Sequence, residues 1–405
     1  YKYFKRDISW LSFNYRVLLE AKDKSLPVYE RIKFLSIYSS NLEEFYKVRV
    51  SGYHSSLVED IKEESVEEAL ETLSEINTEV MKQEEEYYQI FNHEILPELK
   101  ENNITLYQTE EVLPFHREFV TKYFNEEVFP YLAPMIIQKD YIHSFILDAR
   151  IYLVVNLLPR KKKKVESSAN DYTYAIMKIP FAKVPRFIEL PSHNGMDYIM
   201  FIDDIIRANL SSVFPGYNLA EKILKRVKKR KIGAVTRFLF DSEMPDYFLN
   251  YLRDTYEIED EELLPSGRYL NLDDLMDLPN PSDKKLTENL PPPLRVPDFE
   301  KNPSLLSVIR KKDVLMHFPY QSFDYLIRFL MQAAFDPKVL EIKVTQYRVA
   351  ENSAVINSLI SAAKNGKKVT VFVELKARFD EINNFRTAKA MQQAGIKIIY
   401  SLQGL

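Results

Sequence analysis

The strongest constraint in this sequence is a regular alternation of strand-like and helix-like segments near its C-terminal end. Three short apolar runs, rich in β-branched residues, alternate with two amphipathic segments of helical length, at 339–345, 354–364, 368–375, 382–394 and 396–401. Ser353 stands at the N-cap position of the first predicted helix, and Gly366 and Gly395 follow the two helix ends. A β-α-β-α-β order predicts parallel strands joined by right-handed crossovers.

The rest of the chain predicts further domains, because 405 residues exceed what one hydrophobic core usually holds. Residues 1–104 predict a helical N-terminal domain, in which Trp10, Phe13, Val17 and Ala21 recur at helical spacing. Residues 105–300 predict a mixed α+β head domain that ends in a proline-rich linker, 279–297. Residues 301–405 form the α/β domain described above. The fold class we expect is therefore multidomain α+β.

Within the head domain, three strand-like runs precede a basic segment. The runs lie at 150–158, 172–179 and 184–190, and the first two flank a predicted hairpin loop, 160–170. The basic segment at 219–231 is rich in Leu, Lys and Arg, and we predict it to be helical.

Composition excludes several kinds of site. The chain has no cysteine, which removes disulfides, thiolate metal sites and a cysteine nucleophile, and fits a cytoplasmic protein. A net charge of −4 gives no global attraction to nucleic acid. No apolar run is long enough to span a bilayer, which leaves peripheral association with a membrane open. Neither a Walker loop nor a Rossmann glycine fingerprint is present.

Two arginines occupy matching positions after consecutive predicted strands. Arg348 lies three residues past the first strand, and Arg378 lies three residues past the second. Ligands of open parallel sheets bind at the carboxyl ends of the strands, so both guanidinium groups are expected at one site. Arginine matches phosphate oxygens bidentately, which predicts a phosphate or carboxylate ligand. The alternative is that both arginines pair with nearby acids such as Asp380 or Glu381.

A second candidate lies in the helical region, around Asn41. Asn41 falls between two helical runs and Glu44 follows it three residues later, so a helix N-cap with a capping box is one interpretation. The other interpretation is that the Asn41 amide recognises a base, since an amide both donates and accepts. Arg49, two turns further along, would then face the same ligand.

Five ungapped segments resemble the histidine-phosphorylating polyphosphate kinase family. They are RDISWLSFN (6–14), FLSIYSSNLEEF (34–45), HFPY (317–320), IKVTQYR (342–348) and VELKARFDE (373–381). The resemblance covers the whole chain and is weakest in its middle. It implies a helical domain, a head domain used in dimer contacts and two phospholipase-D-like catalytic domains, of which this chain would hold the first two and an incomplete third.

The resemblance also implies a reaction and its site. The family transfers the terminal phosphate of ATP reversibly to inorganic polyphosphate through a phosphohistidine, with Mg²⁺, and we expect a homodimer or homotetramer. Asn41 matches the residue that contacts the nucleotide, and Arg49 and Phe34 are placed nearby. Arg348 and Arg378 match the magnesium–phosphate site, where we expect them to grip magnesium-bound phosphate oxygens, since arginine has no lone pair for a metal.

Departures from the family pattern leave other functions open. The segment bearing the phosphorylated histidine should begin near Gly404 and Leu405, where the sequence stops, and the region around 215–219 is short. We therefore expect this chain alone to be inactive. The alternatives are a non-catalytic nucleotide- or polyphosphate-binding assembly fragment, and a phospholipase-D-like phosphodiesterase with water as acceptor.

Overall fold

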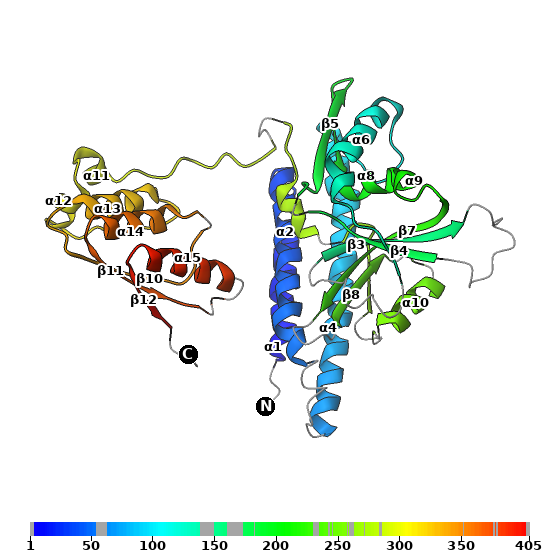
Figure 1. Cartoon of the computed structure of the whole chain (residues 1–405), viewed down its shortest axis with the longest axis horizontal. Helices are drawn as coiled ribbons and strands as arrows, with labels where there is room; N and C mark the ends of the chain where they lie inside the picture. Colours follow the sequence, from blue (N-terminus) through cyan, green and yellow to red (C-terminus); the bar gives the residue numbers. More distant parts are fainter. Residues whose placement is uncertain are drawn as a thin grey trace. The chain divides into compact units, whose positions relative to one another are not determined.

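A computed structural model describes two compact units of this chain, Tyr1–Glu288 and Asn289–Leu405 (Figure 1). The described residues are 4–401, except 54–62, 138–149, 160–172, 182, 230–234, 242–243, 245, 257, 259–262, 271, 283–285, 351, 376 and 378–379. None of the described helices is long and apolar enough to cross a membrane.

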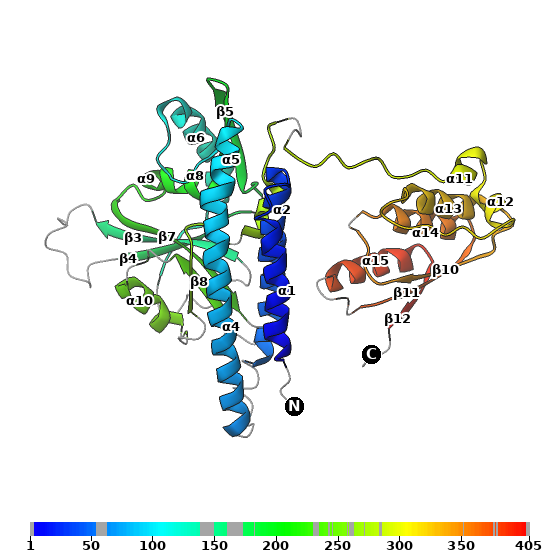
Figure 2. The same ribbon diagram turned by 180° about the vertical axis from the view of Figure 1, so that it is seen from behind.

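Three helical stretches form one side of the first unit (Figure 2). They are α1 (Arg6–Glu20), α2 (Val28–Phe45) with the π-helical turn η1 (Tyr46–Val50), and α4 (Glu63–Ile90), which continues through η2 (Phe91–Ile95) into α5 (Leu96–Glu101). Helix α1 packs against both α2 and α4. Its buried face carries Asp7, Leu11, Asn14 and Leu18. Of the residues expected at helical spacing, Phe13 is 54% exposed, so only part of the predicted face is right.

The head region contributes a six-stranded sheet of order β2-β4-β3-β7-β8-β9. Its strands are β2 (Met135–Ile136), β3 (Arg150–Pro159), β4 (Thr173–Lys178), β7 (Tyr217–Lys229), β8 (Val235–Asp241) and β9 (Leu263–Ser266), with α10 (Asp246–Tyr256) between the last two. Strands β3 and β4 pair antiparallel, as the predicted hairpin requires, although its loop lies outside the described residues.

The prediction of a basic helix at 219–231 is wrong. Most of this segment forms β7, which is hydrogen-bonded to β3 on one side and to β8 on the other. Leu, Lys and Arg favour a helix locally, but β3 offers backbone partners to this segment from Tyr217 to Val227, and β8 offers them from Lys225 to Lys229. Long-range pairing has overridden local propensity here.

A second, three-stranded sheet joins the helical and head regions, in the order β1-β6-β5. Its strands are β1 (Ile104–Leu106), β6 (Met196–Phe201) and β5 (Phe187–His193), accompanied by α6 (Arg117–Tyr123), α8 (Ile202–Ala208) and α9 (Leu210–Val213). Short helical turns lie at Pro114–His116, Phe124–Val128, Phe129–Tyr131 and Leu272–Asp277 (η9). Residues of α1, α2, α4 and both sheets share one continuous apolar core.

The second unit confirms the predicted alternation. After α11 (Pro297–Lys301), α12 (Leu305–Ile309) and α13 (Asp324–Phe335) come β10 (Glu341–Gln346), α14 (Ala354–Lys364), β11 (Lys368–Val373), α15 (Glu381–Gln393) and β12 (Lys397–Tyr400). The three strands are parallel and neighbours in chain order. Ile342, Val369 and Val371 face the helices and are buried, whereas Lys343 and Lys368 pair with Glu341 on the exposed face.

The proline-rich segment between the units contains no helix or strand among its described residues, 278–282 and 286–296. The first part of this segment is hydrogen-bonded to Tyr29 of α2. The Tyr29 hydroxyl donates to the Pro279 carbonyl at 2.6 Å, and the Tyr29 backbone N–H donates to the Leu286 carbonyl at 3.2 Å. Leu294, which belongs to the second unit, forms a single bridge with Gln321 within that unit.

Candidate functional site

Arg348 lies at the carboxyl end of β10, where the sequence places it. Its side chain is 51% exposed, and its Nε is 3.1 Å from a carboxylate oxygen of Asp380. The guanidinium also lies 5.6 Å from the ring centre of Tyr347. The alternative pairing with Asp380 is thus present, but it leaves half of the arginine accessible. Arg378 lies outside the described residues, so the predicted joint grip by two arginines stays a prediction.

Polar side chains tie the ends of the three parallel strands together beneath Arg348. Gln346, the last residue of β10, donates from Nε2 to Oδ1 of Asn384 at 3.0 Å. Ser401, just past β12, donates to a carboxylate oxygen of Glu374, just past β11, at 2.9 Å. Gln346 and Asn384 are almost fully buried, with exposed fractions of 6% and 0%. Polar side chains therefore line the carboxyl end of this sheet, where the buried Gln346 oxygen is left without a hydrogen-bond partner among the described residues.

Two consecutive asparagines of α15 hold the loop that carries Arg348. Nδ2 of Asn384 donates to the backbone carbonyl of Tyr347 at 2.8 Å, and Nδ2 of Asn383 donates to that of Val349 at 2.7 Å. Asn384 also donates to the backbone carbonyl of Glu374 at 2.8 Å. The backbone carbonyls of the two residues next to Arg348 are thus hydrogen-bonded to one helix.

Asn41 lies inside α2, so the interpretation of Asn41 as a helix N-cap is wrong. Helix α2 runs without a break from Val28 to Phe45, because Leu35, Leu42 and Phe45 keep one face buried along its whole length. The Asn41 amide points toward α1 and donates to Oδ1 of Asn14 at 3.1 Å. Asn14 is fully buried and donates in turn to the Tyr38 carbonyl.

Arg49 lies on the same α1–α2 seam as Asn41. It belongs to the π-helical turn η1, and its Nε is 4.0 Å from Oδ1 of Asp7 on α1. Asp7 is buried and accepts a hydrogen bond of 2.6 Å from the Tyr53 hydroxyl. Burial and this hydrogen bond raise the pKa of Tyr53 to about 12. Asn41 and Arg49 therefore both face α1, and Arg49 remains 41% exposed.

Phe34 lies on α2 and is partly buried against the core of the first unit. This contact gives its ring a structural role on the helix that also bears Asn41.

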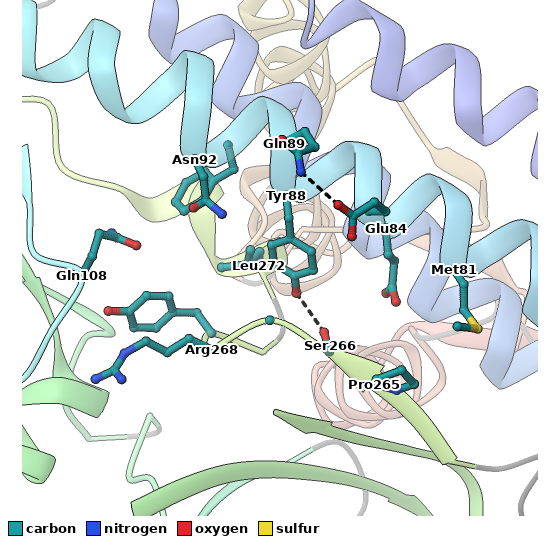
Figure 3. A pocket seen from close by; sticks show the side chains of 14 residues that line it. Met81, Glu84, Tyr88, Gln89, Asn92, Gln108, Pro265, Ser266, Arg268 and Leu272 are labelled. Carbon is teal, nitrogen blue, oxygen red and sulfur yellow. Dashed lines mark hydrogen bonds between the residues drawn. The ribbon is translucent and has the colours of Figure 1, made fainter. Parts of the chain in front are cut away.

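A pocket of about 450 Å³ opens between α4 and the segment 265–272 (Figure 3). Tyr88 and Asn92 line one side, and Ser266 and Arg268 line the other. Arg268 is already paired with Asp204 and Glu110. Burial alone would lower the pKa of Arg268, but its acidic neighbours, Asp204 first, together raise it. None of the site residues predicted from the sequence lines this pocket. The positive charge of Arg268, which does line it, is balanced by Asp204 and Glu110.

Within the described part of the chain, no group of three or more His, Asp or Glu side chains is arranged to hold a metal ion. His317, in the HFPY segment, is exposed and packs edge-on against Tyr320 with ring centres 5.0 Å apart.

Sequence reasoning missed Asn14, Asn383 and Asn384 as members of the candidate site. Asparagine is a poor helix former, because its side chain competes for backbone hydrogen bonds. All three nevertheless lie within α1 or α15. An asparagine in a helix interior, and above all a consecutive pair, is the signal that points to a side chain bonded outside its own helix.

Three family models match this chain in order. The polyphosphate kinase N-terminal domain matches residues 3–107, and the polyphosphate kinase middle domain matches 115–223 and 217–278. The polyphosphate kinase C-terminal domain 1 matches residues 304–405. Together they account for most of the sequence, and all three describe one family.

Individual relatives agree with this assignment. The chain is 34% identical to the polyphosphate kinase of Vibrio vulnificus strain YJ016 over 434 residues, covering 100% of this chain and 61% of that protein. Identity to the Escherichia coli K12 polyphosphate kinase is 34% over 436 residues, covering 62% of it. The crystal structure of polyphosphate kinase from Porphyromonas gingivalis is similar with a TM-score of 0.85 and 45% identity, covering 100% of this chain and 60% of that one. The chain thus spans about three fifths of the length of these relatives.

Proposed function

The chain belongs to the polyphosphate kinase family, and from this premise we propose that the full-length protein transfers the terminal phosphate of ATP reversibly to inorganic polyphosphate. The proposed intermediate is a phosphohistidine, on a histidine that the family pattern places beyond Leu405. That histidine attacks the γ-phosphorus in line, the bond to the β-phosphate oxygen breaks, and ADP leaves. The terminal oxygen of polyphosphate then takes the phosphoryl group from the histidine.

The half-exposed guanidinium of Arg348 is the observation that carries this proposal. It lies past the end of a parallel strand, held by Asp380 through Nε and accessible over half of its surface. An arginine fixed in this way offsets the negative charge on a transferred phosphoryl group, where positioning and charge stabilisation supply most of the catalysis. We propose the same role for Arg378.

Nucleotide recognition falls to the first unit in this proposal. Asn41 presents an amide on the α1–α2 seam, Arg49 lies two turns away on the same side, and Phe34 supports the helix that carries Asn41. Amide and guanidinium groups suit a base edge and a phosphate respectively.

Magnesium belongs to the proposal as a companion of the nucleotide phosphates. Arginine has no lone pair for a metal, so Arg348 is suited to bind the phosphate oxygens that coordinate the ion and not the ion itself. Bound Mg²⁺ would neutralise charge between the β- and γ-phosphates. We further propose a cytoplasmic homodimer or homotetramer, and expect residues 1–405 alone to be inactive.

Incubation of the full-length protein with γ-labelled ATP and Mg²⁺ tests this function. We expect acid-labile, base-stable label on the protein and a labelled polymer that grows with time. Hydrolysis of phosphodiesters to an alcohol and a phosphomonoester, without a nucleotide requirement, would instead identify a phosphodiesterase. Nucleotide or polyphosphate binding with no transfer would indicate a binding or assembly module.

A further inference from the structure

Arg348 has a long side chain on a loop, so its placement depends on what fixes the loop. The two carbonyls that flank it, those of Tyr347 and Val349, accept hydrogen bonds of 2.8 Å and 2.7 Å from Asn384 and Asn383. The first bond fixes the peptide plane between Tyr347 and Arg348, and the second fixes the peptide plane that follows Val349. The backbone direction from which the guanidinium extends is therefore set by α15.

Asn384 connects this loop to the next strand. Its amide nitrogen donates to the Glu374 carbonyl as well as to the Tyr347 carbonyl, both at 2.8 Å. Its oxygen accepts from Gln346, and its backbone N–H donates to the Asp380 carbonyl at 2.7 Å. Asp380 in turn holds Arg348 through its carboxylate. One fully buried side chain thus joins the ends of β10 and β11 to the start of α15.

The side chains of these two asparagines stabilise the loop and not the helix in which they lie. Asparagine is less favourable than alanine inside a helix by roughly half a kcal/mol. Asn383 and Asn384 both lie in the first turn and a half of α15 and both direct their amides to backbone carbonyls of other segments. Helix stability alone does not account for this pair.

We propose that Asn384, assisted by Asn383, is a positioning residue that orients Arg348 toward the transferred phosphate. The inference rests on the proposed function and adds to it the device that fixes the arginine. Displacement of a charge-stabilising group by about 1 Å costs up to about a hundredfold in rate, so loosening the loop acts on the chemical step through Arg348.

Two substitutions test this proposal in the full-length protein. Asn384→Asp keeps the shape but replaces the donating nitrogen with an oxygen that faces two carbonyl oxygens. Asn383→Ala removes the bond to the Val349 carbonyl, together with a 3.3 Å bond that the Asn383 oxygen accepts from the exposed Arg386. Asn357→Asp, at an exposed position of α14, is the matched control for the change in charge.

Each substitution is combined with Arg348→Ala, and kcat, KM for ATP and the thermal unfolding midpoint are measured. We expect Asn383→Ala to lower kcat about tenfold with little change in KM or unfolding, and Asn384→Asp to lower it further. Neither should lower kcat again once Arg348 is alanine. Equal losses with and without Arg348 would overturn the positioning role.

Binding of inorganic triphosphate, measured by calorimetry, separates this inference from the proposed function. If wild type transfers phosphate but the two effects are additive, only the positioning role is wrong. If wild type transfers nothing, yet Asn383→Ala weakens triphosphate binding in the wild-type background and does not weaken it further when Arg348 is alanine, the positioning role stands and the proposed function fails. Binding unaffected by any of these substitutions overturns the positioning role in that case too.

Discussion

The side-chain nitrogen of Asn41 donates a hydrogen bond to Oδ1 of Asn14, 3.1 Å away. Asn14 is fully buried on α1, and its own nitrogen is engaged by the Tyr38 carbonyl, so its oxygen has a fixed direction. That direction orients the Asn41 amide: one N–H points to Asn14, and the oxygen of the amide points elsewhere. A contact between two helices therefore fixes the orientation of the amide that we propose to recognise the nucleotide.

Asn41→Ala is expected to raise KM for ATP about 2- to 10-fold in the full-length protein, with kcat unchanged. One neutral hydrogen bond contributes about 0.5–1.5 kcal/mol, which sets this range. Steady-state kinetics with ATP varied at saturating polyphosphate measures it. Ser40→Ala, one residue away and exposed on the same helix, is the control and should leave KM unaltered. An unchanged KM in Asn41→Ala would remove Asn41 from the nucleotide site.

Arg348→Ala is expected to lower kcat by about 10²- to 10³-fold, which corresponds to roughly 3–4 kcal/mol of lost charge stabilisation. The kcat of Arg348→Lys should lie between those of wild type and Arg348→Ala, since lysine keeps the charge and loses the bidentate fork. At Arg378 we expect the same ranking of kcat, with wild type highest, the lysine variant lower and the alanine variant lowest. Arg310→Ala, at an exposed arginine after α12, serves as control. Turnover within about twofold of wild type in Arg348→Ala would contradict the role given to this side chain.

The sequence was most informative where local signals were sufficient. The limits of α14 match the prediction, because Ser353 caps its start, accepting from the Val355 amide at 3.2 Å, and Gly366 adopts a φ of +82° after its end. Both signals act within a few residues. The parallel order of β10, β11 and β12 follows from the same short-range alternation and the handedness of crossovers.

Predictions failed where distant partners decide the outcome. Strand β7 was predicted as a helix because pairing with β3 and β8 is invisible in its own composition. Asn41 was open to interpretation as an N-cap because continuity of α2 depends on a core built from other helices and sheets. The buried face of α1 includes polar Asp7 and Asn14, which an apolar-periodicity argument does not select. The candidate site uses these polar positions.

At alkaline pH the ionisation of Tyr53 is expected to lower the stability of the protein, and Tyr53→Phe should abolish this contribution. Folding raises the pKa of Tyr53 from 10.0 to about 12, through burial first and the hydrogen bond to Asp7 second. Because the folded state favours the neutral phenol, this stabilisation is complete below about pH 10 and is lost as the pH rises toward about 12. Urea midpoints of wild type should fall over this interval more steeply than those of Tyr53→Phe.

Tyr320→Phe provides the matched control for this titration, because Tyr320 is 62% exposed. Its urea midpoints should follow those of wild type across the whole pH range. Parallel curves for wild type and Tyr53→Phe would show that the Tyr53 hydroxyl does not couple to folding.

Gly267→Ala is expected to destabilise the first unit by about 1–3 kcal/mol through overpacking. A Cβ at this position would lie 2.6 Å from Cε1 of Tyr88, in the wall of the pocket in Figure 3. The ring is held in place, because the Tyr88 hydroxyl is 2.8 Å from Oγ of Ser266 and the ring packs edge-on against Tyr87. The tyrosine therefore has little room to yield.

Gly216→Ala is the control, since a Cβ there meets nothing within 4 Å. It should be neutral or slightly stabilising, because alanine restricts the unfolded chain more than glycine does. The free energy of unfolding in urea measures both substitutions. If the clash with Tyr88 is the cause, Gly267→Ala should cost less in a Tyr88→Leu background, where the ring is absent. An equal cost in both backgrounds would place the cause in the backbone around Gly267, not in the contact between Gly267 and Tyr88.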